Sequence, residues 1–305
     1  MKYPILLIAF ARPDTTSLVI QSIKEAKPSK LYIALDAPRP NRPGEVERHN
    51  KVKELLNNTD WEFDVKYYYQ RNNQGCSKGP YKAISWFFEN EEAGIIIEDD
   101  IVPTSDFYIF CDNMLDTYKE NEKIQSISGW SYFYHDIPVH EYSYYFSHFT
   151  SSWGWASWRR VWEDMDLKLE NIDRQSILNK MKQYGFPWRT RLLFISYFDK
   201  IKENFESLQS WDYQFLFSMW SKDRMVVQPF VSTVKNIGNK EGATHKFSDK
   251  LSEYKTYPLK DIQIPNTIES NISYDLLRIS NEDLYWKPII YWKMIGLKNK
   301  IFRKG

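Results

Sequence analysis

The chain has 305 residues, which is enough for one large α/β domain or two modest ones. Its 41 Lys and Arg residues balance 40 Asp and Glu residues, so the net charge gives no general attraction to nucleic acid, and we expect no nucleic-acid partner. Two cysteines are too few for a disulfide scaffold, and no apolar stretch approaches the roughly 20 residues of a membrane span. Because the first apolar segment is also short for a signal peptide, we expect a cytoplasmic protein.

The first part of the chain alternates apolar segments with helical patterns. We expect strands at Pro4–Phe10, Leu31–Leu35, Phe63–Tyr69, Gly94–Ile97 and Ile124–Ser128. We expect helices at Thr15–Ala26, Glu45–Asn58 and Pro80–Glu89, and from Ser105 to Tyr118. Asp14 and Ser105 are the expected caps of the first and last of these helices, and a loop is expected at Asn72–Gly79. Strands that alternate with helices over short connections predict an α/β fold with a mostly parallel, Rossmann-like central sheet flanked by helices.

The pattern after Gly129 is less regular and richer in aromatic residues. It predicts strands at Tyr142–Phe149 and Met225–Val234, helices at Arg174–Phe205 and Trp211–Trp220, a Trp-rich segment at Ser151–Trp162, and a polar loop at Asn236–His245. We therefore divide the chain into a Rossmann-like half at residues 1–128, a second half of the same domain at 129–250 with a smaller subregion, and a C-terminal extension at 251–305.

The most informative segment is an apolar run that ends in three acids, Gly94-Ile95-Ile96-Ile97-Glu98-Asp99-Asp100. Such a run is typical of a strand buried on both faces of a parallel sheet. Adjacent carboxylates raise each other's pKa and repel, and a hard divalent cation is the usual compensation. Ligands bind at the carboxyl ends of strands in open α/β sheets, so we predict a metal-assisted phosphate site at Glu98–Asp100. The alternative is an acidic loop that caps the next helix.

Two further polar residues follow other predicted strands of the same sheet. Arg12 comes after the first strand and Asp36 after the second, so both are expected at the edge that carries the acids. Arg12 is a candidate to hydrogen-bond a nucleotide, and Asp36 to accept from its base or ribose; alternatively Asp36 only starts a turn. The sequence has neither a P-loop nor a Gly-x-Gly-x-x-Gly after the first strand, and its histidines lack zinc spacing.

An apolar strand that ends in Glu-Asp-Asp resembles the Asp-x-Asp signature of GT-A glycosyltransferases. Further short segments, in the same order over residues 5–245, resemble the N-acetylglucosaminyltransferase I group and similar bacterial nucleotide-diphospho-sugar transferases. These segments are Ile8–Arg12, Asp36, Gly79-Pro80-Tyr81-Lys82, Ile96–Asp100 with Pro103-x-x-Asp106-Phe107, Trp153-Gly154-Trp155, Ser210-Trp211-Asp212-Tyr213, and Asn236-Ile237-Gly238 with Thr244-His245.

The resemblance implies roles for the acids. Asp100 would ligate Mn²⁺ or Mg²⁺, which bridges the donor diphosphate, and Glu98 and Asp99 would hold ribose or sugar hydroxyls. Asp212 would be the general base that accepts the proton of the acceptor hydroxyl, in a single displacement that inverts the anomeric configuration. The resemblance also favours a UDP-sugar as donor. Without it, the leading explanation of Asp212 is an N-cap or first-turn acid of the helix Tyr213–Trp220.

The same resemblance implies contacts outside the acids. Trp155 and Trp211 would stack on acceptor or donor sugars, although tryptophan clusters are also common in cores. His245 would contact the diphosphate or shape a loop that closes over it. The family's phosphate-contacting His has no clear counterpart here, and Lys78 is the candidate to replace it.

The C-terminal segment Trp286–Gly305 contains six Lys and Arg residues and no acid, interleaved with apolar residues. Such segments lie on anionic membrane surfaces, which suits an acceptor that is a lipid-linked glycan at the inner face of the membrane; the alternative is a helix docked on the protein. The leading function hypothesis is thus an inverting, metal-dependent glycosyltransferase in surface-polysaccharide or lipid-linked glycan synthesis. A non-catalytic carbohydrate-binding protein, and a metal-dependent phosphatase or nucleotidyltransferase, are the alternatives.

Overall fold

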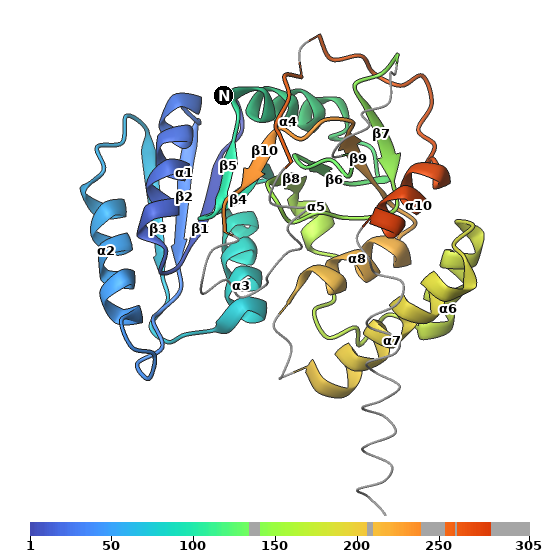
Figure 1. The fold of residues 1–305 in the computed structure, drawn as a ribbon, viewed down its shortest axis with the longest axis horizontal. Coiled ribbons are helices and arrows are strands. Elements are labelled where there is room, and N and C mark those ends of the chain that lie inside the picture. Colours follow the sequence, from blue (N-terminus) through green and yellow to red (C-terminus); the bar gives the residue numbers. More distant parts are fainter. Residues whose placement is uncertain (134–140, 206–209, 239–253, 260, 282–305) are drawn as a thin grey trace, which may run out of the picture.

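The computed structural model describes residues 1–133, 141–205, 210–238, 254–259 and 261–281. Its centre is an eight-stranded sheet in the order β3-β2-β1-β4-β8-β6-β9-β7 (Figure 1). The strands are β1 (Ile5–Ala9), β2 (Lys30–Leu35), β3 (Asp64–Tyr69), β4 (Ala93–Glu98), β6 (Ile124–Ser128), β7 (Tyr144–Ser147), β8 (Trp155–Trp158) and β9 (Met225–Pro229). Within this sheet only β7 and β8 run against the other strands. The predicted α/β fold with a mostly parallel central sheet is confirmed.

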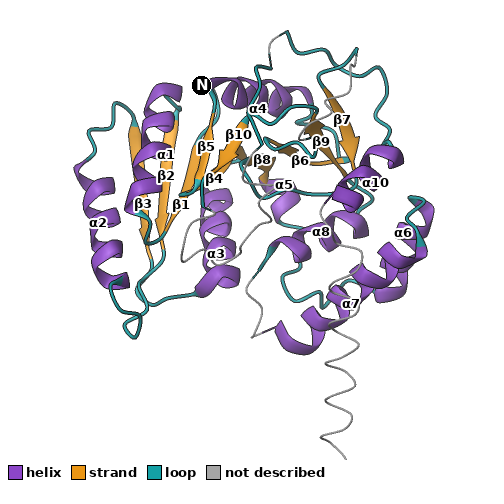
Figure 2. Cartoon of the chain, in the orientation of Figure 1, coloured by secondary structure: helices purple, strands orange, loops and turns teal. Residues whose placement is uncertain are grey.

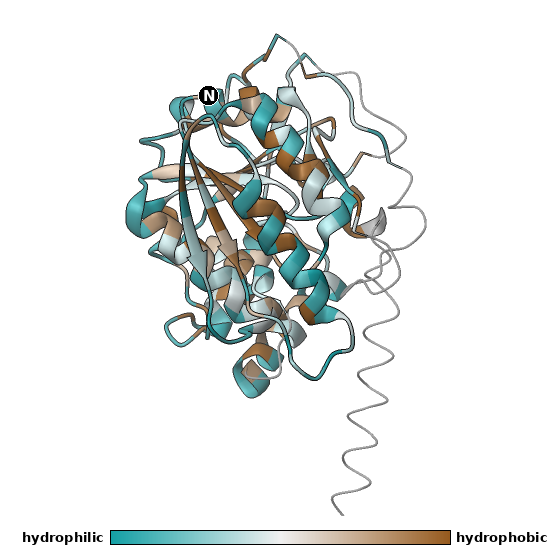
Figure 3. Cartoon of the chain, turned by 90° about the vertical axis from the view of Figure 1, so that its left-hand side faces the viewer, coloured by the Kyte–Doolittle hydropathy of each residue, from teal (hydrophilic) through white to brown (hydrophobic). Residues whose placement is uncertain are grey.

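Helices cover the sheet (Figure 2). They are α1 (Pro13–Ala26), α2 (Glu45–Asn58), α3 (Gly75–Asn90), α4 (Ser105–Thr117), α5 (Arg159–Trp162), α6 (Arg174–Gln183), α7 (Trp188–Asn204), α8 (Asp212–Ser221) and α10 (Ile272–Asn281). α1 packs against α2 and α4, whereas α3 packs against α5. Figure 3 shows apolar strands between helices whose outer faces are more hydrophilic. This layering explains why β1 and β4 are apolar on both faces: each face is buried under side chains.

A second, two-stranded sheet joins distant parts of the chain. β5 (Ile101–Pro103) follows the acids directly and pairs antiparallel with β10 (Val234–Asn236), so that Asn236 lies opposite Ile101. In Figure 1 the two strands lie beside β4 in the middle of the molecule. The single strand predicted at Met225–Val234 was therefore wrong: the chain leaves the large sheet at Pro229 and enters the small one at Val234. β5 was not predicted, because three residues are too few for a periodicity.

Several predicted helix ends differ from the structure. The helix predicted at Arg174–Phe205 is interrupted between α6 and α7, where Gly185 has a φ of +81° that favours glycine. α3 begins at Gly75, inside the predicted loop Asn72–Gly79, and contains Pro80. Pro80 is the sixth residue of the helix and has no N–H to donate to the carbonyl oxygen of Cys76, so α3 is one backbone hydrogen bond short in its second turn.

The predicted helix caps were each displaced. Arg12 occupies the cap position of α1, with Pro13 as the first helical residue, so Asp14 lies in the first turn instead. Thr104, rather than Ser105, precedes α4. Pro13, which has no N–H, is suited to the first helical position and so sets the start of α1. The start of α4 is set by the end of β5 at Pro103.

The core has two main parts. The larger surrounds the central sheet and includes strand residues such as Leu7, Ile33 and Ile97, each with no exposed surface. The smaller lies among α6, α7 and α8 and centres on Phe198, Phe217 and Trp220. The second half of the chain thus adds a helical layer beside the sheet that it shares with the first half.

None of the helices in the described ranges is long and apolar enough to cross a membrane. The predicted membrane-contacting segment Trp286–Gly305 and the loop residues Thr244 and His245 lie outside the described residues.

Candidate active site

The three predicted acids lie at the carboxyl end of β4. Ile95, Ile96 and Ile97 are buried between layers, and the chain turns immediately after Glu98 into β5. β4 runs parallel to β1, with Glu98 opposite Ile8, so the end of β1 lies beside the acids. The backbone N–H of Phe10 donates a 2.8 Å hydrogen bond to Asp99 Oδ2. Two parallel strands therefore deliver the acids and Arg12 to one edge of the sheet, as predicted from the sequence.

Arg12 provides the positive charge at this edge. Its Nη1 lies 3.4 Å from Asp99 Oδ1 and forms a closer ion pair with Asp100 Oδ2. Asp99 and Asp100 are only 5% and 8% exposed, so the pairing is weakly screened by solvent. With Phe10 and Arg12 as partners, Asp99 has both oxygens engaged within the protein. This favours a role for Asp99 in holding Arg12 over its predicted contact with sugar hydroxyls.

Three carboxylates, those of Glu98, Asp99 and Asp100, surround the single guanidinium of Arg12, and burial and this excess of negative charge raise carboxylate pKa values. Burial, followed by the charges of Asp100 and Asp99, raises the pKa of Glu98 to about 8. Burial also raises the pKa of Asp99 to about 7, although Arg12 opposes the rise. At neutral pH this cluster is therefore partly protonated unless another positive charge joins it. A site with this property is suited to bind a cation together with an anionic ligand.

Asp212 belongs to the same electrostatic environment, because its charge contributes to the raised pKa of Glu98. It is the first residue of α8, where the N–H of Tyr213 donates to its Oδ1 at 3.0 Å and Ser210 Oγ forms a shorter hydrogen bond to the same oxygen. The structure thus places Asp212 within electrostatic range of Glu98, although the two residues are more than a hundred positions apart in the sequence. This juxtaposition was predicted only through the family resemblance.

The strand pair β5–β10 places another backbone segment against the acids. The N–H of Ile237 donates a 2.8 Å hydrogen bond to the carbonyl oxygen of Asp100. A Cβ atom on Gly238 would overlap the Asp100 carboxylate, with the Asp100 Cγ only 2.8 Å away. Because Gly238 has no side chain, the Asp100 carboxylate can occupy the space beside it. Asn236-Ile237-Gly238 is part of the family resemblance, but nothing in the sequence connects it to Asp100.

Aromatic residues complete this side of the site. Tyr254 Oη accepts a 2.6 Å hydrogen bond from the N–H of Asn236, and burial, with a contribution from Asp100, raises the Tyr254 pKa. The ring of Trp153 lies nearly parallel to that of Tyr254, with 6.2 Å between centroids, and 4.7 Å from Trp130. Trp153 is partly exposed. Tyr254 was missed because the surrounding sequence has no recognisable pattern.

The predicted sugar contacts Trp155 and Trp211 lie in the core. They are 1% and 5% exposed, with 5.7 Å between their ring centroids, and both pack against Trp162 and Phe215. Neither ring presents a face to solvent in this structure, which favours a packing role. Their packing ties β8 to the start of α8 and so helps to place Asp212.

Asp36 reaches the expected sheet edge, but its carboxylate is engaged. It accepts hydrogen bonds from the N–H groups of Ala37, Gln74 and Gly75 at 2.9 to 3.2 Å, and from Asn73 Nδ2 at 3.2 Å. Burial raises its pKa, while these backbone donors oppose the rise. Asp36 therefore acts as the anion at the amino end of α3, a position that stabilises a helix. This favours a structural role over the predicted contact with a base.

Lys78 lies in the first turn of α3, and its ammonium is 5.5 Å from the centroid of the Phe205 ring. Its predicted contact with phosphate stays a prediction, as does that of His245, which lies outside the described residues.

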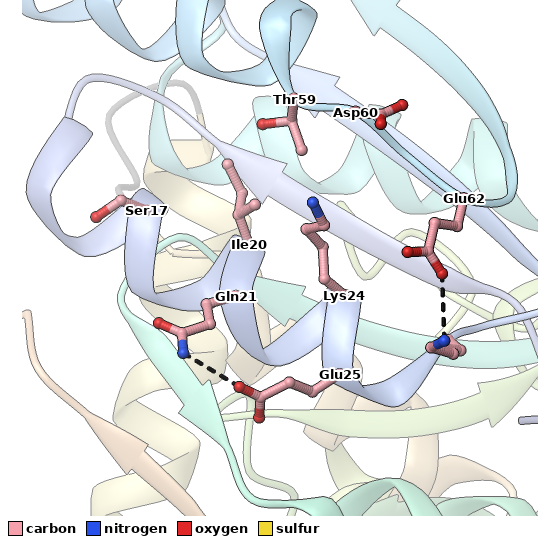
Figure 4. A pocket seen from close by; sticks show the side chains of 9 residues that line it. Ser17, Ile20, Gln21, Lys24, Glu25, Thr59, Asp60 and Glu62 are labelled. Atoms are coloured by element: carbon pink, nitrogen blue, oxygen red, sulfur yellow. Dashed lines mark hydrogen bonds and ion pairs between the residues drawn. The ribbon is translucent and has the colours of Figure 1, made fainter.

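A separate hollow lies over α1 and the segment before β3 (Figure 4). Lys27 and Glu62 form a 3.2 Å ion pair there, and Gln21 Nε2 donates to Glu25 at 3.1 Å. The hollow opens where β2 and β3 begin, whereas the acids follow the end of β4. It is therefore not part of the candidate active site.

The acids fit a divalent cation of a particular kind. Within the described ranges, no three His, Cys, Asp or Glu side chains are arranged to hold a metal ion by themselves. Mg²⁺ is commonly held by one or two carboxylates, with water and substrate phosphate oxygens as the remaining ligands. Asp100 offers hard oxygen donors in a cluster with excess negative charge, so it suits a cation that arrives with an anionic substrate.

No protein-family model matches the chain, and no curated protein matches its sequence. Its structure is similar to that of HddC from Yersinia pseudotuberculosis, with 8% identity and a TM-score of 0.34 over 53% of this chain and 79% of that one. It is also similar to a 4-diphosphocytidyl-2C-methyl-D-erythritolsynthase from Anaerococcus prevotii, with 8% identity and a TM-score of 0.39 over 76% of this chain and 91% of that one. A third similar structure is a UDP-glucose pyrophosphorylase complexed with UDP-glucose, with 11% identity and a TM-score of 0.33 over 75% of this chain and 91% of that one. Likeness at this level carries no argument about activity, which therefore rests on the site.

Proposed function

We propose that the protein is an inverting, metal-dependent glycosyltransferase of the GT-A type, which moves a sugar from a nucleoside-diphosphate donor, UDP-linked by the resemblance, to a glycan hydroxyl. The observation that carries the proposal is the cluster of Asp99 and Asp100 with Arg12 at the carboxyl end of β4, with Asp212 close enough for its charge to act on Glu98. An acid cluster suited to a metal–diphosphate ligand and a separate carboxylate suited to accept a proton occur in one site. The order of these elements along the chain agrees with the sequence resemblance.

The chemistry assigns different tasks to the two sets of acids. The acceptor oxygen attacks the anomeric carbon, the bond from that carbon to the diphosphate oxygen breaks, and its electron pair leaves with the diphosphate. Asp212 accepts the hydroxyl proton during the attack. A divalent cation at Asp100 would balance the charge that develops on the leaving diphosphate. Arg12, paired with Asp99 and Asp100, holds these carboxylates in place and adds positive charge near the phosphates.

Trp153 replaces Trp155 and Trp211 as our candidate for sugar stacking. It is partly exposed and packs against Tyr254, whose pKa responds to the charge of Asp100, so its ring lies on the same side of the site as the acid. Sugar rings present C–H groups that pack well on an indole face. We also propose that the acceptor is a surface polysaccharide or a lipid-linked glycan. This part of the proposal rests on the sequence alone.

Thermal unfolding with UDP, GDP, CDP, CMP and nucleoside triphosphates, each with and without Mn²⁺, tests the proposal. We expect stabilisation by one nucleoside diphosphate that depends on Mn²⁺, because a ligand that binds only the folded state raises the unfolding temperature. Asp100→Ala should abolish this stabilisation, whereas Asp60→Asn, at an exposed acid before β3, should retain it.

A panel of nucleotide-sugars, assayed for Mn²⁺-dependent release of the nucleoside diphosphate, then identifies the donor. Stabilisation only by a triphosphate, with release of pyrophosphate, would instead establish the nucleotidyltransferase. No response to any nucleotide, or an Asp100→Ala variant that binds like the wild type, would overturn the proposal.

A further inference from the structure

The corner between α6 and α7 exposes large apolar side chains. Trp188 and Leu192, at the start of α7, are 59% and 56% exposed, and their spacing of four residues puts them on one face of the helix. The guanidinium of Arg189 lies 5.3 Å from the centroid of the Trp188 ring. Large apolar residues that remain exposed together are unusual for a helix that packs against its own protein.

The corner is also basic. Between Asp173 and Asp199 the sequence has five cationic residues and no acid: Arg174, Lys180, Lys182, Arg189 and Arg191. Arg174 pairs with Asp199 at 2.7 Å, and Lys180 with Asp223 at 3.0 Å. Among the described residues, neither Lys182 nor Arg191 forms an ion pair with a carboxylate. Lys182, which is exposed, and Arg191 therefore add positive charge to the corner that carries the exposed apolar pair.

The turn itself keeps these groups together. The N–H of Phe186 donates to the carbonyl oxygen of Met181, and that of Gly185 to Lys182, at 3.0 Å each. This pattern ends α6 within a single turn, with Gly185 in the left-handed conformation. Phe186 is buried in the core of the helical layer, so the corner is anchored from inside. Lys182 and the start of α7 are consequently held near each other.

We propose that this corner docks on an anionic lipid bilayer. Tryptophan and leucine beside Lys and Arg are the combination that enters the boundary between headgroups and acyl chains, while the cations contact anionic headgroups. The charge favours a bilayer over a neutral apolar partner. The proposal does not depend on the proposed function, since it involves no residue of the candidate active site, and it is separate from the prediction for Trp286–Gly305.

The chain offers a matched control on another helix. Ile109 of α4 is 54% exposed, close to the value for Leu192, but α4 is acidic, with Asp106, Asp112 and Asp116. If exposed apolar surface alone caused binding, Ile109 would contribute as much as Leu192. If the combination with positive charge matters, only the α6–α7 corner contributes.

Flotation of the full chain with vesicles tests the proposal. We use phosphatidylcholine alone and phosphatidylcholine with about one third phosphatidylglycerol, at low and high salt. The wild type should bind the anionic vesicles in a salt-sensitive way and the neutral ones weakly. Trp188→Ser with Leu192→Ser should lower the affinity at least about tenfold, and Lys182→Glu with Arg189→Glu at least about fivefold. Ile109→Ser should bind like the wild type.

All these substitutions are at exposed positions, so the variants should unfold at the wild-type temperature, which is checked in the same samples. Wild-type binding that neither double variant weakens would place the membrane contact elsewhere and overturn the proposal. The absence of binding to anionic vesicles would overturn it as well.

Discussion

The carboxylates after β4 and Asp212 at the start of α8 interact electrostatically, but different kinds of structure hold them. Glu98 ends the strand β4, and Asp99 and Asp100 follow it directly; the neighbouring strands β1 and β8 pair with β4 along most of its length. Asp212 is held by a helix start that depends on the packing of Trp211 with Trp155. The first group is positioned by backbone hydrogen bonds, and the second by side-chain packing between distant segments.

This difference matches the tasks that we assign to the two groups. A metal–diphosphate ligand needs fixed carboxylates, which a sheet edge supplies. A general base must meet an acceptor that enters from outside, and it lies on the helical layer with its own apolar core. We therefore assign the strand-end acids to donor binding and Asp212 to acceptor activation, and we expect substitutions at the two places to have separable effects.

The largest separable effect is expected at Asp212. Asp212→Asn removes the proton acceptor but retains a side chain of the same size, so transfer should fall by about 10²- to 10⁴-fold. Mn²⁺-dependent stabilisation by the nucleoside diphosphate should be unchanged, which distinguishes this variant from Asp100→Ala. Steady-state transfer and thermal unfolding are the measurements, with Ser210→Ala as the control for the hydrogen bond to Asp212. Turnover near the wild-type value would assign the base to another residue.

A smaller effect is expected where the second half of the chain contacts the first. Gly238→Ala places a methyl group against the Asp100 carboxylate, which must move. We expect Mn²⁺-dependent nucleotide binding to weaken about tenfold, because a bulkier residue here displaces the carboxylate. Lys235→Ala, at an exposed position on β10, is the control. Equal nucleotide affinity for Gly238→Ala and the wild type would show that this contact does not position Asp100.

Trp153→Ala should affect the sugar more than the nucleotide. Loss of one stacking ring costs about 1 kcal/mol, so KM for the sugar-bearing substrate should rise about fivefold, while affinity for the free nucleoside diphosphate stays constant. Trp153→Phe should restore most of the KM. Competition titrations with free nucleotide measure the second quantity. A similar loss for the sugar-bearing and free nucleotides would indicate that Trp153 only supports the fold of this side of the site.

The smallest effect concerns pH. The pKa of Glu98 is raised from 4.5 to about 8, so between these values the folded protein holds a proton that the unfolded chain has released. Stability without metal should therefore fall as the pH rises from 5 to 8, by about 5 °C in unfolding temperature. Glu98→Gln should reduce this dependence, with the raised pKa of Asp99 accounting for the part that remains, whereas Glu62→Gln, at the far end of the sheet, should leave it unchanged. Parallel curves for wild type and Glu98→Gln would contradict the raised pKa.

The alternation of apolar segments and helical patterns determined the parallel part of the sheet and the location of Glu98–Asp100, because both depend on short stretches of sequence. Burial of Ile95–Ile97 on two faces forces the acids to the strand end, and that edge is shared by Arg12. These residues were identified from the sequence without any knowledge of tertiary contacts.

Only the tertiary structure decided which of the remaining candidates reach the site. Asp36 lies at the expected edge of the sheet, but backbone N–H groups at the amino end of α3 donate hydrogen bonds to its carboxylate. Trp155 lies in the expected segment, but its side chain is buried. Gly238 reaches Asp100 because β10 pairs with β5, two strands of three residues each. Such pairings depend on contacts between residues more than a hundred positions apart, which leave no periodic pattern in the sequence.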